Sequence, residues 1–87
     1  MAIEHMTAVE RSRRAKELLD DPFLEHFLGQ LELKYVEAWR TSNLNDYDIR
    51  DQAFQRLQAL YEFRADLEVI ATESAVTAFN RRQREAI

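Results

Sequence analysis

The feature that most constrains this chain is the run from Asp46 to Asn80, which contains no glycine and no proline. These two residues are the usual interrupters of helices, so their absence allows one continuous helix over this range. Apolar residues recur along it at helical spacing, beginning with Ile49, Ala53, Leu57 and Leu60. At 1.5 Å per residue the helix would span roughly 50 Å. The rest of the fold must therefore be built around one long helix.

The chain's single proline marks the start of a second helix. Pro22 would break a helix from inside, but proline is favoured at the first helical position. Asp21, immediately before it, is a good N-cap, and its charge suits the positive end of the helix dipole. Apolar residues then recur at spacings of four and three, namely Leu24, Leu28, Leu31, Tyr35 and Ala38. This pattern predicts an amphipathic helix over residues 22–42, with Gly29 in its interior as a point where another helix could approach closely.

A shorter helix is predicted over residues 7–20, where Thr7 and Glu10 have the spacing of a capping box. Its recurring face is small and is formed by Ala8, Ser12, Ala15 and Leu19. The segment TSNLND at 41–46 has turn chemistry and is predicted to be the loop before the third helix. That helix would cover 46–80, with Asn45 or Asp46 as its cap.

The second helix is too short to cover the third. We therefore expect either the first helix or a second subunit to pack against Ala71, Ala75 and Ala78. The predicted architecture is a single all-α domain over residues 1–87, a helical hairpin with a shorter N-terminal helix. A chain of 87 residues with no cysteine can bury only a limited core and has no disulfide to stabilise it. Association into a homo-oligomer is the expected remedy.

Charge and hydropathy exclude several broad classes of protein. The net charge of -4 argues against a protein whose main role is to coat nucleic acid or an anionic membrane. No stretch has the apolar length of a signal peptide or a membrane span. The expectation is a soluble protein of the cytoplasm with no membrane partner. His5-Met6 is a dipeptide that cloning junctions often leave, so residues 1–5 are either native or a cloning leader, and no argument depends on them.

Candidate chemistry is sparse. His26 has no second histidine on its helix, and neither HExxH nor Glu-x-x-His occurs, which favours a surface or interface role over a metal ligand. The paired carboxylates Asp20 and Asp21, like Asp46 and Asp48, are explained by helix ends. No glycine-rich phosphate loop or nucleophile elbow is present. The prediction is a protein that is not an enzyme, with no catalytic residue, no metal and no cofactor.

The aromatic residues outnumber what a contact between two helices can bury on one face. They are Phe23, Phe27, Tyr35, Trp39, Phe54, Tyr61, Phe63 and Phe79. We expect most of them to be core. Trp39 and Phe23 lie about 60 to 100 degrees from the main apolar stripe, which favours a partner contact, although the first helix could cover them instead. The predicted partner interface comprises Phe23, Phe27, Trp39, Tyr61 and Phe63.

Two basic clusters are the other candidate surface. One lies in the first helix, and the other ends the third helix. The predicted basic patch comprises Arg11, Arg13, Arg14, Arg81, Arg82 and Arg84. One interpretation is that these cations favour the helix dipole and pair with neighbouring carboxylates. The alternative is that both clusters meet at one end of the hairpin and bind an acidic partner or DNA phosphate. No aromatic residue lies among them to stack on bases, so nucleic acid is the less favoured partner.

Three segments together resemble a family. They are RAKELLDDPFLEHFLGQLE at 14–32, YVEAWRTS at 35–42 and RLQALYEFRADLE at 56–68, with Arg-Ala, Leu-Leu, Asp-Pro and Ala-Trp as landmarks. They are similar to small helical proteins of unknown function encoded by tailed bacteriophages and prophages, often near virion-assembly genes. The likeness covers roughly two thirds of the chain. In that family a glycine-containing stretch tends to follow the last motif, whereas residues 71–79 here contain none.

Two functions follow from these observations. The first is a phage structural or virion-assembly protein that binds itself and a virion component through apolar helix faces, in the host cytoplasm or in the virion. The alternative is a small phage regulator or inhibitor that docks through the arginine patch onto a host protein or nucleic acid. The resemblance implies the phage setting and no defined activity.

Overall fold

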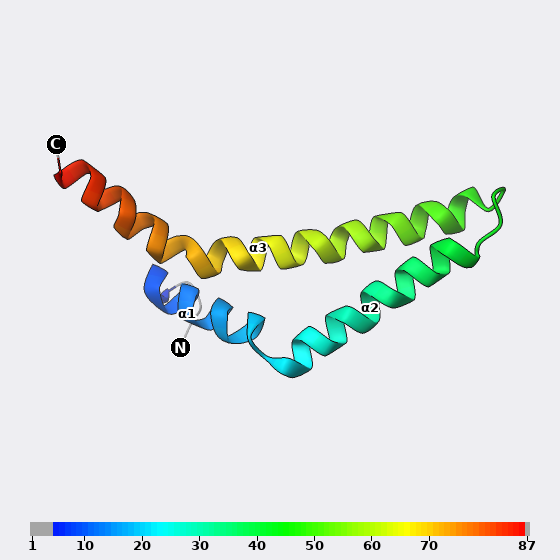
Figure 1. Ribbon diagram of the computed structural model, residues 1–87, viewed down its shortest axis with the longest axis horizontal. Helices are drawn as coiled ribbons and strands as arrows, with labels where there is room; N and C mark the ends of the chain where they lie inside the picture. Colours follow the sequence, from blue (N-terminus) through cyan, green and yellow to red (C-terminus); the bar gives the residue numbers. More distant parts are fainter. Residues whose placement is uncertain (1–4, 87) are drawn as a thin grey trace. The chain divides into compact units, whose positions relative to one another are not determined.

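The structure, a computed structural model, describes residues 5–86. It contains three helices, α1 (Ala8–Leu19), α2 (Pro22–Thr41) and α3 (Tyr47–Glu85), and no strand occurs between residues 5 and 86 (Figure 1). The prediction of an all-α chain with three helices and a long last helix is confirmed. The cloning-leader alternative falls almost wholly on residues that lie outside the described range.

The predicted starts of the first two helices are confirmed. Thr7 is the N-cap of α1, and its hydroxyl oxygen accepts a hydrogen bond from the Glu10 N–H at 3.1 Å. Asp21 is the N-cap of α2, and one carboxylate oxygen accepts from the N–H groups of Phe23 at 2.8 Å and Leu24 at 3.3 Å. Pro22 follows at the first helical position, where its missing N–H leaves no hydrogen bond unmade.

The start of α3 differs from the prediction. Asp46 directly precedes the helix, and its carbonyl accepts from the Arg50 N–H at 3.0 Å. Its carboxylate, however, points back into the loop and accepts from the Asn43 N–H at 3.1 Å. The side chain therefore closes the loop between α2 and α3 instead of capping the new helix.

Helix α3 continues to Glu85, beyond residue 80, which the pattern gave as the least extent of the helix. The segment beyond residue 80 is RRQRE, in which arginine, glutamine and glutamate are good helix formers. Arg82 and Arg84 lie in the last turn, where positive charge is favourable beside the negative end of the helix dipole.

The chain divides into two compact units. The hairpin unit runs from Asp21 to Ala65 and pairs α2 with the first part of α3. The second, here called the α1 unit, combines residues up to Asp20 with those from Asp66 onward. In the hairpin unit α2 lies beside α3 (Figure 1), and the buried apolar side chains are Leu28, Ala53 and Leu60. The predicted stripe of α2 thus faces α3, centred on Leu28.

In the α1 unit, α1 lies beside the second part of α3 (Figure 1), and the contact between them is small. Ser12 and Ala15 of α1 are buried, as is Ala71 of α3, so the small face predicted for α1 does pack against α3 within one chain. Helix α1 does not cover Ala75 and Ala78, which are both exposed, so their contact with a second subunit stays a prediction. Helix α1 ends its contact near Ser74, so the last three turns of α3 have no described neighbour.

Ser12 joins the two helices of the α1 unit through both of its hydrogen-bonding functions. Its hydroxyl donates to the Ile70 carbonyl at 2.8 Å, and the hydroxyl oxygen accepts from the Ser74 N–H at 3.1 Å. Ile70 and Ser74 are four residues apart and would be hydrogen-bond partners in a regular α-helix. The Ser12 hydroxyl therefore bonds to both backbone groups of one position in the hydrogen-bond ladder of α3.

Gly29 has no close neighbour, and a methyl group added there would meet open space. Replacing Gly29 with alanine is therefore expected to raise the free energy of unfolding by about 1 kcal/mol, because glycine is the poorer helix former. Urea unfolding followed by circular dichroism measures this, with Gln30→Ala as an exposed control on the same helix. A loss of stability or of self-association in Gly29→Ala would instead show that a second helix packs against this glycine.

Candidate functional site

Most of the aromatic side chains are on the surface. The expectation that they would be core is wrong: of the eight considered, only Tyr35 is partly covered, and the exposed ones are Phe23, Phe27, Trp39, Phe54, Tyr61, Phe63 and Phe79. The reason is the size of the described core, which consists of alanines, two leucines and one serine. Helices that meet through such small residues approach closely and leave the larger side chains at the edges of the contact.

Two phenylalanines form an exposed pair at the start of α2, here called the aromatic pair. The rings of Phe23 and Phe27 are stacked, with their centroids 6.2 Å apart and their planes 6° from parallel. They are 77% and 48% exposed, so they gain little from burial within the chain. The Asp21 cap fixes the start of the helix that carries them. An ordered, exposed pair of this kind is a ready contact for another apolar surface.

A second apolar surface lies where the end of α2 meets the beginning of α3, here called the aromatic groove. It is a hollow of about 140 Å³ lined by Tyr35, Val36, Trp39, Ala53, Phe54 and Leu57. Trp39 is 47% exposed and Phe54 55% exposed, so each covers the groove from one helix and still faces solvent.

Arg50 holds Trp39 in place. Its guanidinium carbon lies 4.6 Å from the Trp39 ring centre, within cation–π range. The same guanidinium donates to the Ser42 hydroxyl at 3.2 Å, and that hydroxyl donates to the Trp39 carbonyl at 2.6 Å. The loop, the end of α2 and the first turn of α3 are thereby tied to one another around the indole.

The remaining predicted interface residues lie on different sides of α3. The Tyr61 hydroxyl donates to the Glu32 carboxylate of α2 at 3.1 Å. Partial burial, together with this hydrogen bond and the charge of Glu32, raises the pKa of the Tyr61 phenol. Phe63 follows two residues later and so points about 200° around the helix axis from Tyr61. The two side chains therefore cannot contribute to one flat surface.

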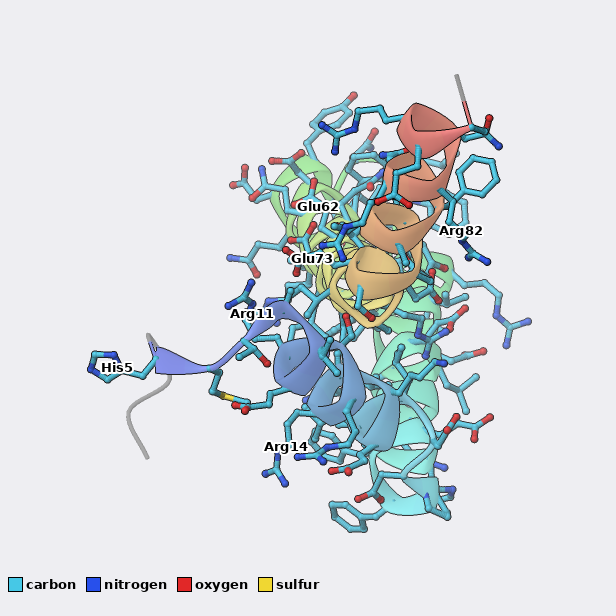
Figure 2. All side chains as sticks on the ribbon, turned by 90° about the vertical axis from the view of Figure 1, so that its left-hand side faces the viewer. His5, Arg11, Arg14, Glu62, Glu73 and Arg82 are labelled. Carbon is cyan, nitrogen blue, oxygen red and sulfur yellow. The ribbon has the colours of Figure 1, made fainter. Side chains whose placement is uncertain are left out.

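The arginines of α1 are partly engaged by carboxylates. Arg11 donates to the Met6 carbonyl at 2.7 Å and lies 3.4 Å from Glu73 of α3, and Figure 2 shows these two side chains on the same side of the unit. Arg13 and Arg14 both approach Glu17, at 3.9 Å and 3.4 Å. Two guanidinium groups thus share one carboxylate.

The arginines at the end of α3 lie apart from those of α1. Arg81, Arg82 and Arg84 are all exposed in the last two turns. In Figure 2 Arg82 lies to the right of the helix, whereas Arg11 and Arg14 lie to the left and below. We therefore treat the two clusters as separate groups.

The structure reveals a groove that we did not anticipate from the sequence, here called the arginine-rimmed groove. It is an open hollow of about 620 Å³ in the α1 unit, lined by Met6, Glu10, Arg11, Arg13, Arg14, Ala15, Leu18, Leu67 and Ile70. The available signal was the spacing of Arg11, Arg14, Ala15 and Leu18, which places basic and apolar residues along one side of α1.

Between residues 5 and 86 no group of three or more metal-ligating side chains comes together, and His26 lies exposed on α2. Within the same range no helix combines the length and apolar character that crossing a bilayer requires. Comparison of the chain with protein-family models, with curated proteins and with solved structures finds no match.

Proposed function

We propose that this chain is a non-enzymatic assembly protein that binds copies of itself through the aromatic surfaces of its hairpin unit. The observation that carries the proposal is the imbalance between core and surface. Between residues 5 and 86 the buried apolar residues are three alanines and two leucines, while nearly all large aromatic side chains are exposed. Burying one such side chain is worth about 1.5 to 3 kcal/mol. Exposed large apolar side chains that gather in a groove or a stacked pair are typical of interaction sites.

The distribution of these side chains suggests contacts on more than one side. The aromatic groove and Tyr61 occupy one flank of the hairpin unit, and Phe63 points away from Tyr61 on α3. The aromatic pair adds a further exposed surface on α2. A dimer that used one flank would leave the other in water, so we propose an oligomer larger than a dimer or a larger assembly.

The phage setting is the second part of the proposal. It is supported by the resemblance of residues 14–32, 35–42 and 56–68 to small proteins of tailed phages, a family whose members are often encoded near virion-assembly genes. On this proposal the chain acts in the host cytoplasm or the virion, and a virion component is its second partner. The resemblance is the basis for proposing a phage setting, and the exposed apolar surface is the basis for proposing binding through helix faces.

Multi-angle light scattering tests self-association directly, using the wild-type chain and the double variant Phe23→Glu, Phe27→Glu. We expect the wild type to be an oligomer and the variant to dissociate with a Kd at least about tenfold higher. Glutamate is compatible with the first turns of α2, because negative charge near a helix N-terminus is favourable. Circular dichroism should therefore show unchanged helix content.

Leu44→Glu is the matched control, because Leu44 is 80% exposed in the loop between α2 and α3. It places one negative charge, half that of the double variant, on the same unit and should leave the mass of the oligomer unchanged. A wild-type chain that stays monomeric as its concentration is raised would overturn the proposal. So would an equal loss of association in the Leu44 variant, since the effect would then come from charge alone.

A further inference from the structure

The arginine-rimmed groove combines two chemical characters that the proposed self-association does not use. Its floor is apolar: Ala15 is buried at the contact of α1 with α3, while Leu18 and Ile70 remain 48% and 38% exposed. The charged residues of its lining are three arginines and one glutamate, Arg11, Arg13, Arg14 and Glu10, so the lining is positive on balance. A floor of aliphatic side chains gains by removing another apolar surface from water, and the rim fixes the charge of what can approach.

The rim arginines keep hydrogen-bonding capacity. Arg11 already donates to Met6 and Glu73, but Arg13 and Arg14 share the single carboxylate of Glu17. Each guanidinium offers five N–H donors, so most of those on Arg13 and Arg14 are left for a ligand. Exposed ion pairs of this kind contribute little to stability and can be exchanged at low cost.

We propose that the arginine-rimmed groove binds an acidic amphipathic helix of a partner protein. Apolar side chains of the partner, repeated at three- and four-residue spacing, would cover Leu18, Leu67 and Ile70. Carboxylates along the edge of the same helix would pair with Arg13 and Arg14, where bidentate geometry favours carboxylate. The inference deepens the proposed function by naming the chemistry of the second partner, but it concerns the α1 unit and does not depend on self-association.

Two other occupants fit less well. Nucleic acid would gain nothing from an aliphatic floor, and none of the lining residues is aromatic, so bases have no surface on which to stack. A second copy of this chain would have to present an acidic apolar face. The exposed face of α2 that carries Phe23 and Phe27 continues through Gln30 to Lys34, so these positions offer no carboxylate to the groove.

The test measures fluorescence anisotropy of a labelled helical peptide of about 20 residues, with leucines at three- and four-residue spacing and glutamates on the flanks. The full-length wild-type chain should bind this peptide and should not bind the same peptide with lysine in place of glutamate. The double variant Arg13→Gln, Arg14→Gln should weaken binding at least tenfold. Leu18→Asn should do the same, because it places an amide on the floor.

The matched control is Arg81→Gln, Arg82→Gln, which removes the same charge from the same unit outside the groove. It should change the affinity by less than about twofold at moderate salt. Failure of the wild-type chain to bind the glutamate peptide would overturn the proposal, as would equal losses in the two double variants. If a DNA oligonucleotide displaced the glutamate peptide, the proposal would be overturned in favour of nucleic acid. If a peptide copy of residues 22–41 bound at Arg13 and Arg14, it would be overturned in favour of a second copy of this chain. Because Phe23→Glu, Phe27→Glu should bind the glutamate peptide normally, the two proposals can fail independently.

Discussion

Replacing Leu28 with alanine is expected to lower the free energy of unfolding of the hairpin unit by about 2 to 4 kcal/mol. Among residues 5–86, Leu28 is one of two large apolar side chains that are buried, and it is 7% exposed within the α2 stripe. With so few large groups in the core, no neighbour can fill the space that the substitution leaves. Urea unfolding followed by circular dichroism measures the effect, at equal protein concentrations so that association contributes equally.

Leu33→Ala is the control for this substitution. Leu33 lies on the same helix and is 57% exposed, so the same loss of side-chain atoms should cost less than about 0.5 kcal/mol. A similar loss for both leucines would mean that the exposed face of α2 is covered in solution. A loss below about 1 kcal/mol for Leu28 would mean that the contact between α2 and α3 contributes little to stability.

The second large effect is expected at Ser12, where valine should release α1 from α3. Ser12 is buried and its hydroxyl bridges Ile70 and Ser74, so valine removes the bridge and adds bulk at a close helix contact. Overpacking of this kind costs about 1 to 3 kcal/mol. A helix of 12 residues is marginal alone, so released α1 should unfold. Trypsin cleavage after Arg11, Arg13 and Arg14 should accelerate at least about tenfold, because proteolysis follows the open population.

Ser12→Ala separates the hydroxyl from the added volume. Alanine removes the bridge but leaves room for the contact, and the Ile70 carbonyl can then pair fully with the Ser74 N–H. We expect a cost of about 1 kcal/mol and a smaller rise in cleavage rate. A Ser12→Val variant as resistant to trypsin as the wild type would show that α1 is not held at this point.

The helix boundaries could be predicted because they depend on local chemistry. Thr7, Asp21 and Pro22 act on backbone groups within four residues of themselves, so their effect can be recognised without knowledge of the tertiary structure. The Asp46 carboxylate shows the limit of this reasoning. This carboxylate could accept a hydrogen bond from the first turn of α3 or from the preceding loop. The conformation of the loop brings the Asn43 N–H to it.

The extent of burial could not be predicted in the same way. The periodicity of apolar residues indicates which side of a helix is apolar. How many residues on that side become buried depends on the position of the neighbouring helix. Phe54 and Tyr61 therefore remain exposed although they flank a predicted stripe in which Ala53 and Leu60 are buried, and Ile49 at the start of that stripe is exposed as well. Ala75 shows the same limit in the α1 unit, because nothing in its own sequence neighbourhood indicates where α1 ends its contact.

The arginine-rimmed groove could be predicted only in part. The charges and the leucine on one side of α1 follow from spacing, whereas Leu67 and Ile70 come from a helix more than 45 residues later. The contacts of the basic residues could also be predicted only in part, because some of them join segments far apart in the sequence. Arg11 lies 3.4 Å from Glu73 of α3, a partner that the spacing along α1 does not indicate, whereas the place of Arg82 in the last turn of α3 follows from the sequence.

The setting of Trp39 has a practical consequence for studies of this chain. It is the only tryptophan, and its indole is held by Arg50 at the turn of the hairpin unit. Its fluorescence therefore reports on that unit alone, since the α1 unit contains no indole. Circular dichroism sums the helices of both units. If the two signals change at different urea concentrations, the units melt separately, and the emission of one residue is enough to tell which melts first.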